Sequence, residues 1–250
     1  MSEGELYPWL VAGWFGLGVV VFVVLHFVAA PYGRHDRSRV GPTMSSRAGW
    51  LVMEVPAAVG VLTWFAVAGF PRGPLPLLLL WQLHYTYRGL VYPFLVRSKK
   101  PMPAVIALSG CAFNLVNTYL IGRGLTVYSP AYDAAWFRHP RTLAGIALFL
   151  AGFLLHVHSD RILRTLRASG DGGYAVPTGG MFRWVSCPNY LGEILQWIGF
   201  ALAAAIPAAA AFALFTFANL APRARAHHLW YRTTFPDYPK ERRALIPLLY

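Results

Sequence analysis

Titratable side chains interrupt the long apolar runs of this sequence, and they are its best candidates for chemistry. Glu54 lies in GWLVMEVPA, and the stretch HYTYRG contains His84, Tyr85 and Arg88. An ionisable group within a bilayer is costly unless it is paired or lines a cavity, so it marks a functional site by default. A carboxylic acid that is kept neutral there can donate a hydrogen bond to a carbonyl oxygen. These residues therefore indicate acid chemistry or ligand binding inside a membrane domain.

A second polar group follows the apolar run near residue 150, in HVHSDRILRTLR. Spacings of four, eight and eleven residues place one set on a single helical face: His156, Asp160, Arg164 and Arg167. Such a stripe favours an anionic cofactor at the membrane surface. His158 is two residues from His156 and points to another side of the helix, so we expect no metal site despite the HxHxD spelling.

A third polar group stands at the start of the next apolar run, in SCPNYLGEILQW. Asn189 and Glu193 are four residues apart and share one helical face. Pro188 suits a first helical turn, and Ser186 is a candidate N-cap. Glu193 would then lie inside the bilayer.

Long apolar runs must position these residues. They cover 9–30, 50–70, about 75–96, about 104–121, about 143–157 and 190–220. The last run is too long for one span, and Pro207 is its natural break, which gives seven helices in all. Hydrophobic residues make up 56% of the chain, charged residues 13%, and the mean hydropathy is +0.45. This composition predicts an all-α, polytopic membrane protein and excludes a disordered chain or an ordinary soluble enzyme.

The distribution of basic residues predicts the orientation. Most of the 22 Lys and Arg residues fall in 31–49, 97–103, 158–188 and the tail after 220. By the positive-inside rule the C-terminus faces the cytoplasm and the N-terminus lies outside. We expect a multi-pass protein of the inner membrane in a bacterium, or of the endoplasmic reticulum in a eukaryote. The net charge of +12 is scattered between apolar runs, so membrane lipids and an anionic small molecule are better partners than nucleic acid.

The last hundred residues resemble the steroid 5α-reductase family. The similar strings are HVHSDRILRTLR, GGMFRWVSCPNYLGEILQWIGFALA and FPDYPKERRALIP, in that order and at the family's spacing. The upstream strings GWLVMEVPA and HYTYRGLVYP also resemble family elements. Two departures concern the site: Met53 stands where Gln is frequent, and His156 stands where Asn is familiar.

The resemblance implies one integral membrane domain over 1–250, built of seven membrane helices. Steroid-site helices would occupy about 9–121, and helices, loops and tail of an NADPH site about 143–250. It implies reduction of the Δ4 double bond of 3-oxo-Δ4 steroids, with NADPH as hydride donor to C5. We expect no Rossmann domain, because GxGxxG is absent from the chain. We expect a monomer.

The resemblance also assigns roles to residues. Glu54 and Tyr85 match the pair that hydrogen-bonds the steroid 3-ketone, with Tyr87 as an alternative to Tyr85. Trp50 and Met53 adjoin this pair at the substrate site. Positions at the NADPH site are matched by Arg88, His156, Asp160, Arg167, Asn189, Glu193, Arg223, His227 and Tyr231.

Three alternatives remain open at the level of sequence. One is a different NADPH-dependent lipid enone or enoyl reductase on the same scaffold. Another is an isoprenylcysteine-type membrane methyltransferase that uses S-adenosylmethionine, although the ending DYPKERRALIP favours the reductase. The third is a lipid- or sterol-binding membrane protein without catalytic activity.

Overall fold

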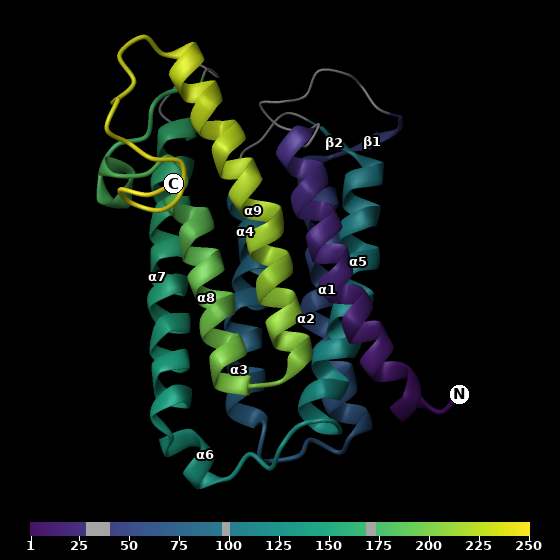
Figure 1. The fold of residues 1–250 in the computed structure, drawn as a ribbon. Coiled ribbons are helices and arrows are strands. Elements are labelled where there is room, and N and C mark those ends of the chain that lie inside the picture. The colour runs from purple at the N-terminus through teal and green to yellow at the C-terminus, as the bar shows by residue number, and fades with distance from the viewer. Residues whose placement is uncertain (29–40, 97–100, 169–173) are drawn as a thin grey trace.

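The computed structural model describes residues 1–28, 41–96, 101–168 and 174–250, without the side chains of 167 and 168. Long helices dominate it: α1 (Glu3–Phe27), α2 (Ser46–Val67), α3 (Leu75–Tyr85), α5 (Ala104–Thr126), α7 (Pro140–Ala168), α8 (Pro188–Ala204) and α9 (Pro207–Thr234). They run up and down side by side, and α7, α8 and α9 form one flank of the bundle (Figure 1). Much of the predicted basic segments 31–49 and 97–103 lies outside the described residues.

Four described helices are long and apolar enough to cross a membrane. They are α1, α2, α5 and residues 140–166 of α7. Most of the α1 surface is exposed, including Trp9, Val19 and Val23. An apolar helix with so little buried surface suits a lipid environment. The chain is therefore of membrane type, while the count of seven spans and the orientation of the termini stay predictions.

The shorter elements lie between and beyond these helices. They are β1 (Thr43–Met44), the π-helical segment η2 (Thr86–Val91), α4 (Tyr92–Leu95), β2 (Met102–Pro103), α6 (Ala134–Arg138) and the 3₁₀ turn η3 (Gly180–Arg183). Strands β1 and β2 pair antiparallel, with Thr43 opposite Pro103. This pair, η3 and the C-terminal segment lie at one end of the bundle, and α6 lies at the other (Figure 1).

Several bounds differ from the predicted ones. The run 75–96 is one helical stretch in three parts, because the π segment η2 separates α3 from α4. Helix α7 continues beyond the apolar run to Ala168, as the shared helical face of His156, Asp160, Arg164 and Arg167 predicted, because HSDRILRTLR is amphipathic. Helix α9 continues past Pro222 to Thr234 and includes half of the predicted tail. Between α8 and α9 the chain breaks as predicted: Ala205 is left-handed, and α9 begins at Pro207.

Glycines allow α7 and α8 to pack backbone against backbone. A Cβ atom added at Gly192 would lie 2.5 Å from the backbone N of His156, and one at Gly152 would lie 2.5 Å from the backbone O of Gly192. Gly145 and Gly199 form the same kind of contact one heptad away. Small residues of this kind let membrane helices approach closely. This contact fixes the position of His156 relative to the first turns of α8.

Side chains from two neighbouring helices fasten α2 near Pro56. Nδ2 of Asn114, in α5, donates to the carbonyl O of Met53 at 2.7 Å, and Nε1 of Trp81, in α3, donates to the carbonyl O of Ala57 at 2.9 Å. A proline inside a helix removes one backbone hydrogen bond, so outside donors are valuable there. These bonds hold the turn of α2 that carries Glu54.

Candidate active site

Glu54 and Arg88 form the centre of a buried ionic network. Glu54 is 8% exposed, and its Oε1 lies 3.4 Å from Nε of Arg88. The π segment η2 brings Arg88 to α2 through a close approach: a Cβ atom at Gly89 would lie 3.2 Å from the carbonyl O of Glu54. Single-turn π segments are frequent at functional sites, because they rotate the following side chains away from the regular α-helical spacing.

Arg88 also links the first half of the chain to the second. Its Nη1 lies 4.0 Å from Oδ2 of Asp160 in α7. Its guanidinium carbon lies 4.5 Å from the centre of the Trp50 ring and 5.0 Å from that of Tyr92, which are cation–π distances. Trp50, predicted at the substrate site, thus contacts a predicted cofactor-binding residue.

The imidazole of His156 lies between two carboxylates. Nε2 is 3.3 Å from Oδ2 of Asp160, and Nδ1 is 3.5 Å from Oε2 of Glu193 in α8. Nδ2 of Asn189 donates to Oδ1 of Asp160 at 3.5 Å. The network therefore joins Glu54 to five other residues that were predicted at the site: Arg88, His156, Asp160, Asn189 and Glu193. His156, at a position where the family often has Asn, is its middle member.

Among the described residues, several polar atoms of this network are buried without a hydrogen bond. They are Nε of Arg88, both ring nitrogens of His156 and Oδ2 of Asp160. The ionic contacts of these atoms are long, at 3.3 Å or more. Buried polar groups without partners are costly, and a polar ligand would satisfy them. Both donors and acceptors are present, which fits a carboxamide such as that of a nicotinamide.

The two candidate tyrosines differ in their surroundings. Tyr85 is 4% exposed, and no described residue hydrogen-bonds its hydroxyl. Its ring packs against Trp81 and Trp197, with ring centres 4.6 Å and 5.7 Å away. The hydroxyl of Tyr87 instead accepts a hydrogen bond from Nη1 of Arg164 at 2.7 Å. Tyr85 is thus the tyrosine with a hydroxyl available to a ligand.

His84 takes part in a separate contact that the sequence spacing did not reveal. Residues four apart, such as His84 and Arg88, share a face on a regular α-helix, but the π segment begins at Thr86 and changes that spacing. The buried His84 instead bonds through Nδ1 to Nε2 of Gln196 at 2.8 Å. Oε1 of Gln196 is buried without a partner. Gln196 follows Asn189 by seven residues on α8, which is the signal that could have identified it.

Residues of α9 continue the site toward the end of the bundle that carries the C-terminal segment. The guanidinium of Arg223 lies 5.8 Å from the centre of the Tyr190 ring, and Nε2 of His227 lies 3.2 Å from the Tyr190 hydroxyl. Tyr231 is buried, and its ring stacks on that of Tyr238 at 5.3 Å. These three residues stand four apart along α9, next to the turn of α8 that carries Asn189. The Arg167 side chain lies outside the described residues.

The C-terminal segment closes this end of the protein over the start of α8. Backbone N–H groups of Ser186 and Cys187 donate to the carbonyl O atoms of Arg243 and Ala244 at 2.8 Å and 3.1 Å. The buried Arg242 donates through Nη1 to the carbonyl O of Pro177 at 3.0 Å. The string ALIP near the C-terminus thus pairs with the string VSCPN of the other matching motif.

Ser186 does not cap α8, contrary to the prediction. The N-cap is Cys187, and it makes no side-chain capping bond. Oγ of Ser186 lies 2.6 Å from Nδ1 of His228 and 2.7 Å from the Tyr238 hydroxyl, and it donates to the carbonyl O of Arg243 at 3.1 Å. A serine has one proton to donate. His228 and Tyr238 are therefore the donors to Ser186, which assigns the Nδ1–H tautomer to His228.

A bundle of membrane type that encloses an incompletely satisfied ionic network indicates a membrane-type protein with a polar ligand site. A family model described as 3-oxo-5-alpha-steroid 4-dehydrogenase matches residues 100–250. The 3-oxo-5-alpha-steroid 4-dehydrogenase 1 of Bos taurus is 44% identical over 239 residues, which cover 93% of each chain. The Homo sapiens protein of that name is 41% identical and covers 94% of this chain and 92% of its own.

A plant relative gives the same result. Steroid 5-alpha-reductase DET2 of Arabidopsis thaliana is 41% identical over 238 residues, which cover 91% of this chain and 90% of its own. The chain therefore belongs to the steroid 5α-reductase family of oxidoreductases, as the sequence motifs predicted. Membership of this family disfavours the methyltransferase alternative.

Proposed function

We propose that this protein reduces the Δ4 double bond of 3-oxo-Δ4 steroids to 5α-dihydro steroids, with NADPH as the hydride donor. One observation carries the proposal: the buried acid Glu54 and the buried Tyr85, whose hydroxyl has no partner among the described residues, adjoin a network of unsatisfied polar atoms. The reaction requires two such donors, an acid and a hydroxyl, at the ketone oxygen.

The chemistry demands stabilisation of an oxygen anion. When a hydride reaches C5 of the enone, negative charge develops on the 3-ketone oxygen. A preorganised donor at such an oxygen contributes about 3–4 kcal/mol to catalysis. Tyr85 supplies one donor, and Glu54 supplies a second when it is protonated. A neutral carboxylic acid beside a tyrosine stabilises a steroid dienolate in the same way in other enzymes. A proton from water then completes the reduction at C4.

Arg88 and residues of the second half of the chain would hold the cofactor, which supplies the hydride. The carboxamide of the cofactor would be oriented by the residues that carry or adjoin the unsatisfied atoms: Arg88, His156, Asp160, Asn189 and Glu193. Arg223, His227 and Tyr231 follow along α9 and offer cationic and aromatic groups for its phosphates and rings. We include Arg167 in this set by the family motif.

We further propose a single domain in which residues 9–121 contribute the steroid site and residues 143–250 the cofactor site. The contact between Arg88 and Asp160 supports it, because it joins these two parts at the centre of the network. We also propose seven spans with the C-terminus in the cytoplasm. An apolar steroid would then enter from the bilayer, and the anionic cofactor from the basic cytoplasmic side.

The test is a turnover assay on purified protein in detergent, with NADPH and either testosterone or progesterone. We expect loss of absorbance at 340 nm and a gain of two hydrogen atoms in the steroid by mass spectrometry. Glu54→Gln should lower turnover sharply and leave NADPH affinity near that of the wild type, since an amide is a weaker donor than a carboxylic acid. Binding of NADPH without a steroid product would reject the steroid and redirect the search to other lipid enones. Wild-type turnover by the variant would remove Glu54 from the chemistry.

A further inference from the structure

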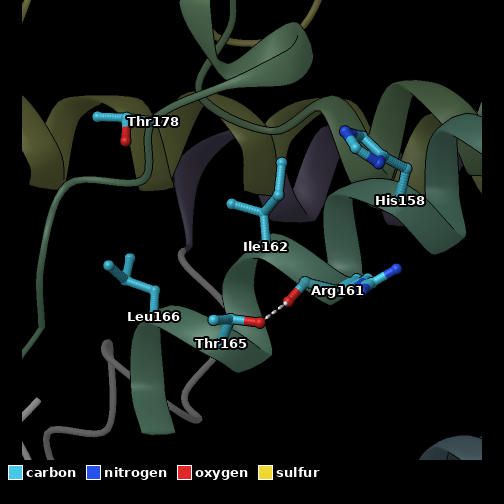
Figure 2. A pocket seen from close by; sticks show the side chains of 6 residues that line it. All are labelled: His158, Arg161, Ile162, Thr165, Leu166 and Thr178. Carbon is cyan, nitrogen blue, oxygen red and sulfur yellow. Dashed lines mark hydrogen bonds between the residues drawn. The ribbon is translucent and has the colours of Figure 1, made fainter. Parts of the chain in front are cut away.

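A pocket of about 360 Å³ lies on the outer face of α7 (Figure 2). Helix α7 and the segment before η3 provide its lining: His158, Arg161, Ile162, Thr165, Leu166 and Thr178. His158 and Arg161 are exposed, whereas His156 and Asp160 on the opposite face of the same helix are buried in the ionic network. A ligand in this pocket would therefore contact the face of α7 opposite to the ionic network.

The exposed face of α7 changes from apolar to polar at this pocket. Leu143, Leu150 and Leu154 are 52%, 40% and 67% exposed. His158 and Arg161 continue the same face at intervals of four and three residues. An exposed leucine row that ends in a polar and a cationic side chain marks the level where the hydrocarbon core of a bilayer meets its headgroups. The pocket thus opens at the headgroup level, with an apolar track beside it.

Backbone contacts hold the wall of the pocket opposite α7. Gly179 and Gly180 both have positive φ, which lets the chain turn sharply after Thr178. A Cβ atom at Gly180 would lie 2.9 Å from Nε2 of His158, so this turn approaches the helix closely. The buried Arg242 fixes the same segment by its bond to the carbonyl O of Pro177 at 3.0 Å. These contacts fix the wall of the pocket opposite α7.

The polar lining suits a phosphate group. Within the part of the chain that the structure describes, the side chains of Arg161 and His158 take part in no ion pair or hydrogen bond. Arginine binds phosphate oxygens in a bidentate way, and the N–H of the neighbouring His158 adds a donor, whereas Thr178 lies across the pocket from the nitrogen end of Arg161 (Figure 2). Ile162 and Leu166 line the apolar side of the pocket.

We propose that this pocket binds the phosphate headgroup of an anionic phospholipid, with the acyl chains of the lipid along Leu154 and Leu150. The leucine row selects a lipid over a free phosphate ester, because only a lipid covers this exposed apolar surface. The lipid would fasten the outer face of α7, whose inner face carries His156 and Asp160. The proposal rests on the surface of α7 and not on the proposed reaction.

The experiment is native mass spectrometry of delipidated protein with phosphatidylglycerol or phosphatidylcholine. We expect one phosphatidylglycerol to bind about tenfold more tightly than phosphatidylcholine, and Arg161→Gln to weaken it about tenfold. His158→Gln should weaken it less. The matched control is Arg183→Gln, an exposed arginine of η3 that does not line the pocket and should leave the affinity unchanged.

Three results would overturn the proposal. One is equal affinity for the two lipids, and another is an equal loss in Arg161→Gln and Arg183→Gln, which would indicate attraction to overall charge. The third is displacement of the lipid by glycerol 3-phosphate at equal concentration, because the pocket would then recognise a free phosphate ester. We expect glycerol 3-phosphate to leave the lipid bound. Thermal midpoints of the variants in detergent check that all of them fold.

Discussion

Oε1 of Glu54 lies 3.4 Å from Nε of Arg88. This contact favours the ionised state of the proposed catalytic acid, Glu54, over its protonated state. A carboxylate beside the guanidinium is an acceptor, whereas the proposed reaction needs a carboxylic acid that donates to the ketone. Arg88 also contacts Asp160, at 4.0 Å, so it has a second carboxylate to pair with. The shift of Arg88 from Glu54 toward Asp160 would leave Glu54 free to bind a proton and the steroid. The network can thus couple the cofactor side to the acid.

The first prediction separates the two candidate tyrosines. Tyr85→Phe should lower kcat about 10²–10³-fold, the usual cost of losing one donor at a developing oxyanion. Tyr87→Phe is the matched control and should retain most of the turnover, because the Tyr87 hydroxyl is bonded to Arg164 at 2.7 Å. Steady-state kinetics of both variants would measure the difference. The reverse ranking would assign the ketone to Tyr87.

The second prediction concerns the stability of the ionic network. Arg88→Met leaves Glu54 without its cation and Asp160 with His156 alone, and breaking a buried pair costs about 3–5 kcal/mol. We expect a clear drop in the thermal midpoint in detergent. Adding Glu54→Gln to Arg88→Met should recover part of the loss, since it removes the unpaired charge of Glu54. Strictly additive losses in this double-mutant cycle would mean that the two side chains are not coupled.

The third prediction concerns the glycine contact between α7 and α8. Gly192→Ala places a methyl group 2.5 Å from the backbone N of His156, so the helices must separate. Because His156 and Glu193 sit beside this contact, we expect weaker NADPH binding and a lower thermal midpoint. Gly13→Ala in α1 is the control, as an added Cβ there has no neighbour within 4 Å. It should be neutral or slightly stabilising, since alanine favours helix more than glycine does. Equal behaviour of the two variants would contradict the close packing.

The fourth prediction is a pH dependence of stability from His228. Burial, with Arg232 and Arg243 nearby, lowers the pKa of His228 in the folded protein below its usual value. The unfolded chain then binds more protons than the folded one once the pH falls below about 6.5, so stability decreases on acidification. His228→Asn should flatten the loss of thermal midpoint between about pH 7 and pH 5. His139→Asn, on an exposed residue at the opposite end, should leave the loss as it is.

Much of the site could be predicted from the sequence, by hydropathy and by the free-energy cost of burying a charge. Glu54, Arg88 and His156 attracted attention because charged or titratable groups are expensive in apolar helices, and the structure brings them together. The break before Pro207 followed from the same reasoning, since proline cannot continue a helix without losing a hydrogen bond. The assignment of roles to these residues came from family motifs, because cost alone does not distinguish a ketone site from a cofactor site.

Other features depend on contacts between distant segments, which periodicity does not show. Ser186 looked like an N-cap, but it bonds to His228 and Tyr238 from α9 and the C-terminal segment. The seven-residue spacing of Gly145 and Gly152 matches that of Gly192 and Gly199, yet only the packed helices show that the two pairs meet.

The π-helical turn at Thr86–Val91 has a consequence for comparing sequences of this type. A π turn holds one more residue than the α-helical turn it replaces, so deleting a single residue there would restore a regular helix. The deletion would leave the apolar pattern acceptable to a membrane, but it would rotate Arg88 away from Glu54. A relative that lacks one residue in this stretch should therefore be expected to have lost the pairing, however similar the rest of its sequence. At this position an alignment gap carries chemical information.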